Sequence, residues 1–112
     1  MRSRTDLVAT AFRSGRLRAM AVGLLTLELH LTEAQSLKDK RQVLRSLKDR
    51  LRQNFNVAVA ELDFEDTWQR SVVGVVTLSN EEQYVEEALQ KVLAEADRVL
   101  GPILISHTVD LL

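Results

Sequence analysis

The chain has 112 residues, of which 46% are hydrophobic and 28% charged, and its formal net charge is −1. This length suits one domain with a core large enough to fold without disulfides or a structural metal. The absence of cysteine excludes disulfides, thiolate zinc sites and cysteine nucleophiles. Because no apolar run approaches the roughly 18 residues of a membrane span, we expect a cytoplasmic protein with no membrane contact.

Charge is distributed unevenly along the sequence. Residues 1–19 carry a net charge of +4, residues 36–54 hold seven cations against two acids, and the rest of the chain carries −10. A general basic coat for nucleic acid is therefore excluded. Any contact with an anionic partner has to be local and oriented.

The first 19 residues show no sustained periodicity and end just before a second methionine, Met20. They are rich in arginine and poor in acids, which also fits a transit peptide. Their apolar segment at residues 7–12 is too short and polar for a secretory signal. We therefore expect residues 1–19 to be a disordered or non-native extension and residues 20–112 to form the domain.

Leucine at alternate positions from residue 25 to residue 31 predicts a strand with one buried face. A helix follows. Ser36 with Asp39 three residues later is a variant of the capping box, and a leucine stripe continues the helix to about Gln53.

The predicted helix has two distinct faces. At about 100° per residue, Leu44, Leu47 and Leu51 form one apolar stripe. Five cations fall within an arc of roughly 80° beside the stripe, and they are Lys38, Arg41, Arg45, Lys48 and Arg52. One face can therefore pack on a core while the adjacent face, the cation row, is offered to an anionic partner.

A structural explanation of the cation row is the alternative. Residues 79–100 carry six acids and two bases, so the cations could neutralise a second, acidic helix packed beside the first. Charge balance alone does not need a one-sided row. We therefore favour an anion-binding role.

Downstream of residues 54–56, which break the helix, two strands, a helix and a last strand are predicted. Residues 57–64 and 71–78 are alternating or β-branched and form a hairpin with a polar connection. Ser79 and Glu82 form a capping box for the second helix, which Gly101 and Pro102 end. Residues 103–109 are the last strand.

The order strand, helix, strand, strand, helix, strand predicts an α+β fold. It is most simply the ferredoxin-like βαββαβ arrangement, a four-stranded antiparallel sheet with two helices on one face. Either Val73 and Val75 or Val72 and Val76 then lie on the open face. A partly apolar open face predicts a homodimer or a partner protein.

Candidate catalytic and metal-binding residues are weak. Glu61 and Asp63 share a strand face, but acids at a strand end are usually hydrated and no calcium-loop pattern accompanies them. His30 and His107 fall on different strands without a third ligand. The four glycines form no phosphate-binding loop pattern. We therefore expect no catalytic residue, no metal and no cofactor.

No aromatic residue lies in the middle of a predicted central strand, so the base stacking typical of RNA-recognition motifs is not expected on the sheet. Trp68 with Arg70, beside the hairpin connection, is the candidate for a stacking or partner contact. The alternative is a tryptophan that folds back over the sheet edge.

Three stretches together resemble the YlxP-like family of small bacterial proteins, a domain of unknown function. They are Ser-Leu-Lys-Asp-Lys-Arg at residues 36–41 with its continuation to Arg52, Phe-Asn-Val-Ala-Val-Ala-Glu at residues 55–61, and Asp-Thr-Trp-Gln-Arg at residues 66–70. The resemblance covers about residues 20–110, and residues 78–80 also fit it.

The resemblance implies a ferredoxin-like domain and a role as ribosome-binding factor P in maturation of the small (30S) ribosomal subunit. It brings no catalytic residues. Its tryptophan segment falls on Trp68, Gln69 and Arg70, and its basic-helix motif falls on Lys38, Lys40, Arg41, Arg45 and Arg52.

We therefore expect a non-enzymatic protein that binds RNA or the 30S ribosomal subunit through the first helix of the domain. The expected contact residues are Lys38, Lys40, Arg41, Arg45, Lys48 and Arg52. The alternative is a homodimeric protein-interaction module that recognises an acidic protein partner with the same helix.

Overall fold

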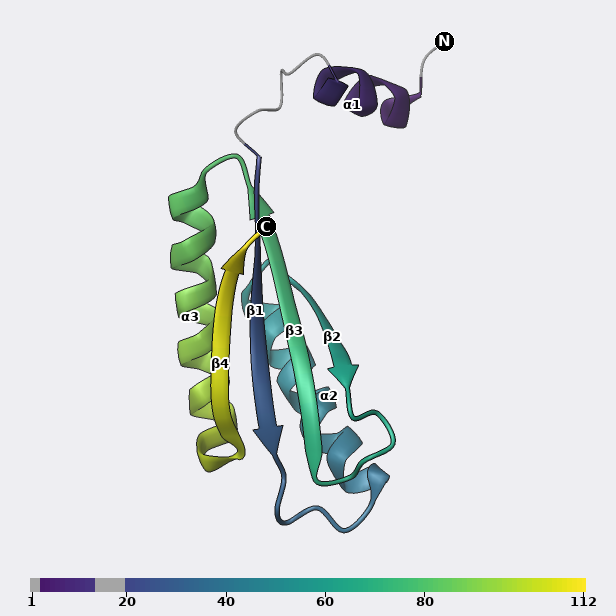
Figure 1. Ribbon diagram of the computed structural model, residues 1–112, viewed down its shortest axis with the longest axis vertical. Coiled ribbons are helices and arrows are strands. Elements are labelled where there is room, and N and C mark those ends of the chain that lie inside the picture. Colours follow the sequence, from purple (N-terminus) through teal and green to yellow (C-terminus); the bar gives the residue numbers. More distant parts are fainter. Residues whose placement is uncertain (1–2, 14–19) are drawn as a thin grey trace.

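The computed structural model describes residues 3–13 and 20–112 (Figure 1). What the sequence predicts for residues 1–2 and 14–19 lies outside the described residues. The elements in chain order are α1 (Arg4–Arg13), β1 (Ala21–His30), α2 (Leu37–Asn54), β2 (Ala58–Asp63), β3 (Arg70–Ser79), α3 (Glu82–Leu100), a 3-10 turn η1 (Gly101–Ile103) and β4 (Leu104–Leu111).

The four strands form one antiparallel sheet in the order β2-β3-β1-β4 (Figure 1). The central strands β1 and β3 pair over their full length, and β2 and β4 are the edges. Helices α2 and α3 contact each other and share one core with the sheet. This is the predicted ferredoxin-like arrangement of an α+β fold.

The core lies between the sheet and the two helices. Its sheet side is built from Leu25, Leu27 and Leu29 of β1 and from Val73 and Val75 of β3, all with no exposed surface. The alternate residues of β3, at positions 72 and 76, are half-buried. Because side chains alternate along a strand, these two valines are the pair that lies on the open face.

Strand β1 begins earlier than the leucine pattern predicts. Gly23 faces α3, where an added Cβ would come within 2.5 Å of Val85 Cγ1 and 2.7 Å of Leu89 Cδ1. The close approach of the helix requires glycine there. Since glycine contributes no apolar side chain, the strand signal appears only from Leu25 onward.

The two ends of α3 differ in how well they were predicted. The predicted capping box is wrong, because Glu81 occupies the N-cap position without a side-chain hydrogen bond. Ser79 Oγ instead accepts a hydrogen bond from the Glu81 N–H at 3.2 Å. The predicted end of α3 is confirmed, since Gly101 at φ 55° is its C-cap.

None of the α1 residues whose side chains the structure describes is buried. The buried apolar residues of the described chain all lie between Leu25 and Leu100. In α1, Leu7 is 54% exposed. That residues 1–19 stand outside the domain stays a prediction. Within the described ranges, no helix combines the length and the apolar character needed to cross a membrane.

Candidate functional site

Side-chain hydrogen bonds fix the start of α2. Ser36 is the N-cap, and its Oγ accepts a hydrogen bond from the Asp39 N–H at 3.0 Å. Asp39 Oδ2 in turn accepts from the Gln35 N–H at 2.9 Å. The first bond satisfies an amide donor that the first turn leaves without a partner inside the helix, and the second ties the residue before the N-cap to the same turn. The predicted start at Ser36 is confirmed.

The apolar stripe of α2 packs into the core and thereby turns the cation row outward. Leu44 is 4% exposed, and Leu47 and Leu51 have no exposed surface. Of the row, Lys48 is half-buried and the other four members are exposed. None of the five forms an ion pair with any of the described residues. The row is therefore an outward-facing set of cations without anionic partners in the described chain.

The opposite flank of α2 meets the acidic helix α3. Arg50 Nε lies 3.3 Å from Glu95 Oε1, and Arg98 Nη2 lies 2.6 Å from the same oxygen. The hydrogen bond from Arg98 is the main cause that lowers the pKa of Glu95, and Arg50 adds to it. The cation that balances α3 is thus Arg50, on the far side of the apolar stripe, so charge balance with α3 does not account for the cation row.

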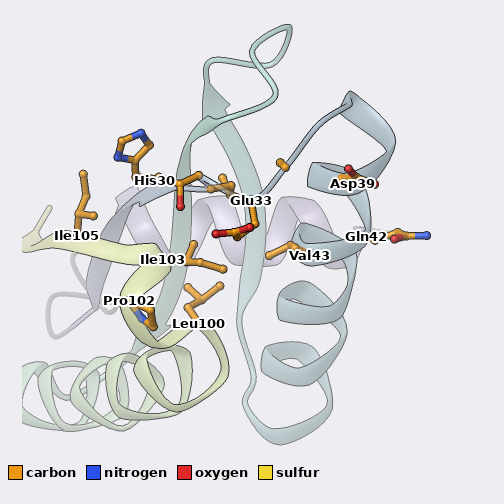
Figure 2. A pocket seen from close by; sticks show the side chains of 12 residues that line it. His30, Glu33, Asp39, Gln42, Val43, Leu100, Pro102, Ile103 and Ile105 are labelled. Atoms are coloured by element: carbon orange, nitrogen blue, oxygen red, sulfur yellow. The ribbon is translucent and has the colours of Figure 1, made fainter.

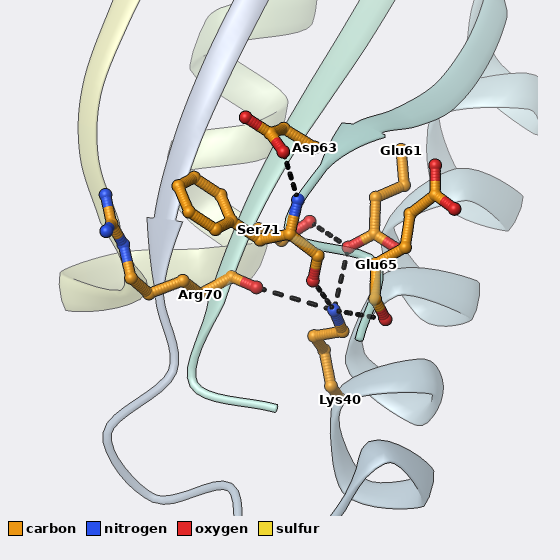
Figure 3. A network of polar contacts seen from close by, with 7 residues as sticks. Lys40, Glu61, Asp63, Glu65, Arg70 and Ser71 are labelled. Atoms are coloured by element: carbon orange, nitrogen blue, oxygen red, sulfur yellow. Dashed lines mark hydrogen bonds and ion pairs between the residues drawn. The ribbon is translucent and has the colours of Figure 1, made fainter. Parts of the chain in front are cut away.

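Lys40 has a different position from the other predicted contact residues. Its side chain is 1% exposed, and Nζ lies 3.0 Å from Glu61 Oε2 (Figure 3). Nζ also donates to the backbone carbonyls of Phe64 at 2.7 Å, Glu65 at 3.3 Å and Arg70 at 3.4 Å. The prediction that Lys40 contacts RNA needs correction, because its donors are used inside the protein and its charge is covered.

The sequence contained a signal for the burial of Lys40. It lies three residues after Leu37 and four before Leu44, in the middle of the apolar stripe and outside the arc of the cation row. Only the resemblance places Lys40 among the contact residues. Its position around the helix predicts its burial.

Glu61 is the anionic partner that makes this burial possible. Its Oε2 accepts hydrogen bonds from both Lys40 Nζ and Ser71 Oγ. Asp63 has a local role, since its Oδ1 accepts from the Phe64 N–H at 2.7 Å. The two carboxylates therefore do not act as a pair. No cluster of three histidine or acidic side chains suited to a metal occurs in residues 3–13 and 20–112, and His30 and His107 are exposed on β1 and β4.

Arg52 combines exposure with a contact to the sheet. Its side chain is exposed, yet Nη2 donates to the Val59 carbonyl of edge strand β2 at 3.0 Å. This bond ties the end of α2 to the edge strand. Arg52 therefore has fewer free donors than Arg41 and Arg45, which form no side-chain hydrogen bond within the described part of the chain.

The connection between β2 and β3 carries the second predicted contact. Trp68 is 47% exposed. Arg70 is engaged internally, with its guanidinium 4.1 Å from the centre of the Phe64 ring and 3.5 Å from Glu28 Oε1. Gln69 Nε2 donates to backbone carbonyls of the β1–α2 connection. Trp68 is thus available on a connection held by hydrogen bonds, whereas Arg70 helps to shape the fold.

Fold and site together define a ferredoxin-like domain whose first sheet-packed helix carries a cation row without ion pairs among the described residues. Comparison with known sequences identifies the family of this domain. The family described as "Protein of unknown function (DUF503)" matches residues 22–105. Uncharacterized protein YlxP of Bacillus subtilis (strain 168) is 38% identical over 76 residues, 68% of this chain and 83% of YlxP. The chain therefore belongs to this YlxP-like family, as the resemblance indicated.

Solved structures support the fold and no more. A de novo designed protein, Foldit4, superposes with a TM-score of 0.53 at 12% sequence identity, over 83% of this chain and 96% of the designed one. A C-terminal segment of the alpha subunit of aIF2 from Pyrococcus abyssi gives a TM-score of 0.48 at 16% identity, covering 83% of this chain and 49% of that one. The second likeness is too low to carry an argument.

Proposed function

We propose that this protein is a non-enzymatic RNA-binding protein of ribosome maturation that contacts structured RNA of the 30S subunit through α2. The observation that carries the proposal is the cation row, which faces outward and has no ion pair among the described residues. At 1.5 Å per residue, the row extends about 21 Å along the helix from Lys38 to Arg52. That length suits several backbone phosphates in succession.

The chemistry of the row favours phosphate as its ligand. Three of the five members are arginines, whose planar guanidinium groups bind phosphate oxygens with two parallel hydrogen bonds. The central pair, Arg41 and Arg45, lies one helical turn apart on the same side. The 30S target is the role that the resemblance implies, and it is part of the proposal. Trp68 is a second contact available to an unstacked base.

The proposal is tested by sedimentation of the purified protein with 30S subunits across a salt series. Binding through phosphates releases counterions, so affinity should fall steeply with salt, with a slope of about one unit for each phosphate contacted. Salt-insensitive pelleting, or no association at low salt, would contradict the proposal. Binding of an acidic protein in place of RNA would favour the alternative partner.

A matched pair of variants assigns the binding to α2. Arg45→Glu should weaken 30S binding by at least about tenfold and reduce the salt slope by about one unit. Lys91→Glu makes the same change of charge on α3, where Lys91 is exposed, and should change binding less than about twofold. Equal losses in both variants would show that only the total charge matters.

A second candidate function, self-association, is favoured by the open face of the sheet. Leu62 and Leu78 are 52% and 60% exposed, and the half-buried Val72 and Val76 lie on the same face. Arg70 and Glu28 also lie on this face, but they form an ion pair with each other. Their charges therefore add little repulsion between two copies. We propose that a second copy of the chain covers this apolar face.

Sedimentation equilibrium tests this second candidate. A dimer at micromolar concentration that Leu78→Asp converts to a monomer would support it. A monomer at every concentration up to about 1 mM, where even weak association contributes about 4 kcal/mol, would exclude it. Because Leu78 lies outside the cation row, Leu78→Asp should abolish the dimer but keep 30S binding. Measuring both properties on this variant therefore distinguishes self-association from RNA binding.

A further inference from the structure

A cavity of about 570 Å³ lies between the first turns of α2, the end of α3 and the β1–α2 connection (Figure 2). Its volume is within the usual range of ligand sites, about 300 to 1,000 Å³. The cavity is on the side of α2 that faces α3, since Val43 lines it together with Leu100 and Ile103. It is therefore separate from the cation row.

The interior of the cavity is apolar and its rim is acidic. Leu31, Ala34, Val43, Leu100 and Ile103 provide the apolar surface. Figure 2 shows the carboxylate of Glu33 beside Val43 and Ile103, whereas Gln42 points away. Glu33 is exposed and forms no ion pair with a described residue.

Charge around the cavity favours a cationic ligand. The lining contains two acids, Glu33 and Asp39, and one histidine, His30, but no lysine or arginine. An apolar group alone would leave the Glu33 carboxylate desolvated without a partner, which is unfavourable, whereas an apolar group beside a cation satisfies both parts of the site.

Hydrogen bonds hold one wall of the cavity, the β1–α2 connection, in place without a ligand. The Leu31 N–H donates to the Gln69 carbonyl at 2.8 Å, and the Ala34 N–H donates to the Leu31 carbonyl at 3.1 Å. Gln69 Nε2 donates to the Ala34 carbonyl at 3.4 Å. A connection fixed by these bonds loses little conformational entropy when it binds a ligand.

We infer that this cavity binds a basic peptide segment of a partner protein, in which an apolar side chain enters between Val43 and Ile103 and a neighbouring lysine or arginine pairs with Glu33. The inference goes beyond the proposed RNA contact. The cavity and the cation row lie on opposite flanks of the apolar stripe of α2. The protein would then recognise anionic and cationic partners on separate surfaces.

The experiment uses the full-length chain labelled with 15N and a synthetic peptide of about ten residues with the central sequence Arg-Leu-Ile-Arg between glycine and serine. Titration should produce saturable amide shifts at residues 30–34 and 100–105. Two control peptides test the chemistry without altering the protein. Serine in place of Leu-Ile removes the apolar anchor, and glutamate in place of both arginines removes the cations, so each should weaken binding by at least about tenfold.

Protein variants complete the test. Glu33→Lys and Ile105→Ser, at exposed positions that line the cavity, should each weaken peptide binding by at least about fivefold. Their matched controls are Glu86→Lys on α3 and Leu78→Ser on the open face, both exposed, which should change binding less than about twofold.

Three results would overturn the inference. One is amide shifts confined to the acidic surface of residues 82–91, and another is the same affinity for Glu33→Lys as for the unaltered protein. The third is a set of shifts at residues 30–34 that depends on protein concentration without peptide, which would show that a second copy occupies the cavity. Loss of 30S binding in Arg45→Glu would leave these results unchanged, so the two proposals can fail separately.

Discussion

Lys40 and Arg41 are consecutive residues of α2 with opposite surroundings. Lys40 is 1% exposed and surrounded by the Glu61 carboxylate and three carbonyls. Arg41 is exposed and has no ion pair in the described ranges. A step of about 100° around the helix separates them. The comparison shows that angular position decides whether a cation of α2 holds the fold or faces outward.

The interactions of Lys40 meet the requirements of a buried cation. An ammonium group has three donors, and Nζ has four acceptor atoms within 3.4 Å. Three of these acceptors belong to residues 64–70, which include the connection from β2 to β3. Lys40 therefore ties this connection, and with it Trp68, to the first turn of α2.

Removal of the Lys40 charge tests this comparison with the largest expected effect. Lys40→Met should destabilise the fold by about 3–5 kcal/mol, because it removes the cation that pairs with Glu61 and the donor to three backbone carbonyls. Urea unfolding measures the loss. Lys38→Met, at an exposed position on the same turn, is the control and should change stability by less than about 0.5 kcal/mol. A loss below about 1 kcal/mol in Lys40→Met would contradict the structural role.

Truncation of the apolar stripe gives the next effect. Leu44→Ala should cost about 2–5 kcal/mol through lost burial and the cavity left behind, since Leu44 is 4% exposed. Binding to 30S subunits should fall only in proportion to the unfolded fraction. Comparison of binding curves with circular dichroism at the same temperature checks this proportion. A loss of affinity in fully folded protein would place the stripe in the interface.

The N-terminal arginines provide a further test of where binding resides. Deletion of residues 1–19 removes five arginines but no residue of the described core. The melting temperature should change by less than about 5 °C, equivalent to about 1 kcal/mol for a domain of this size. The Arg45→Glu variant should still lose 30S binding in the shortened chain. A larger fall in melting temperature, or loss of binding on deletion alone, would show that residues 1–19 have a structural or binding role.

Removal of the Glu95 charge, which pairs with Arg50 and Arg98, should have the smallest effect. Since the pKa of Glu95 is lowered by Arg98 and Arg50, its contribution to stability is present above the ordinary pKa of glutamate and is lost as pH falls through the lowered value. The contribution should be small because the pair is on the surface. Urea midpoints of Glu95→Gln and the unaltered protein should differ slightly at neutral pH and coincide at about pH 2. A difference that grows on acidification would contradict a stabilising contribution from the ionised Glu95.

The predictable parts of the molecule were those set by local pattern. Alternating leucines located most of β1, and the leucine stripe with Ser36 gave α2 and its cation row. The parts missed depend on tertiary contacts. Strand β1 continues through Gly23, where the close approach of α3 requires glycine. Lys40 is buried beside Glu61, which is distant in the sequence but adjacent in space. The cavity beside Glu33 joins segments from four parts of the chain, so no local pattern indicated it.

The central claim is that the cations of α2 divide into two that pair with acids of the fold, Lys40 and Arg50, and a row that we propose binds RNA. Its most direct test measures urea unfolding and 30S binding on the same preparations of Lys40→Met and of the triple variant Arg41→Glu, Arg45→Glu and Lys48→Glu. We expect Lys40→Met to lose about 3–5 kcal/mol of stability while its folded fraction binds normally. The triple variant should stay within about 1 kcal/mol of the unaltered protein and lose binding. A triple variant that unfolds, or one that remains folded and still binds 30S subunits, would contradict this division.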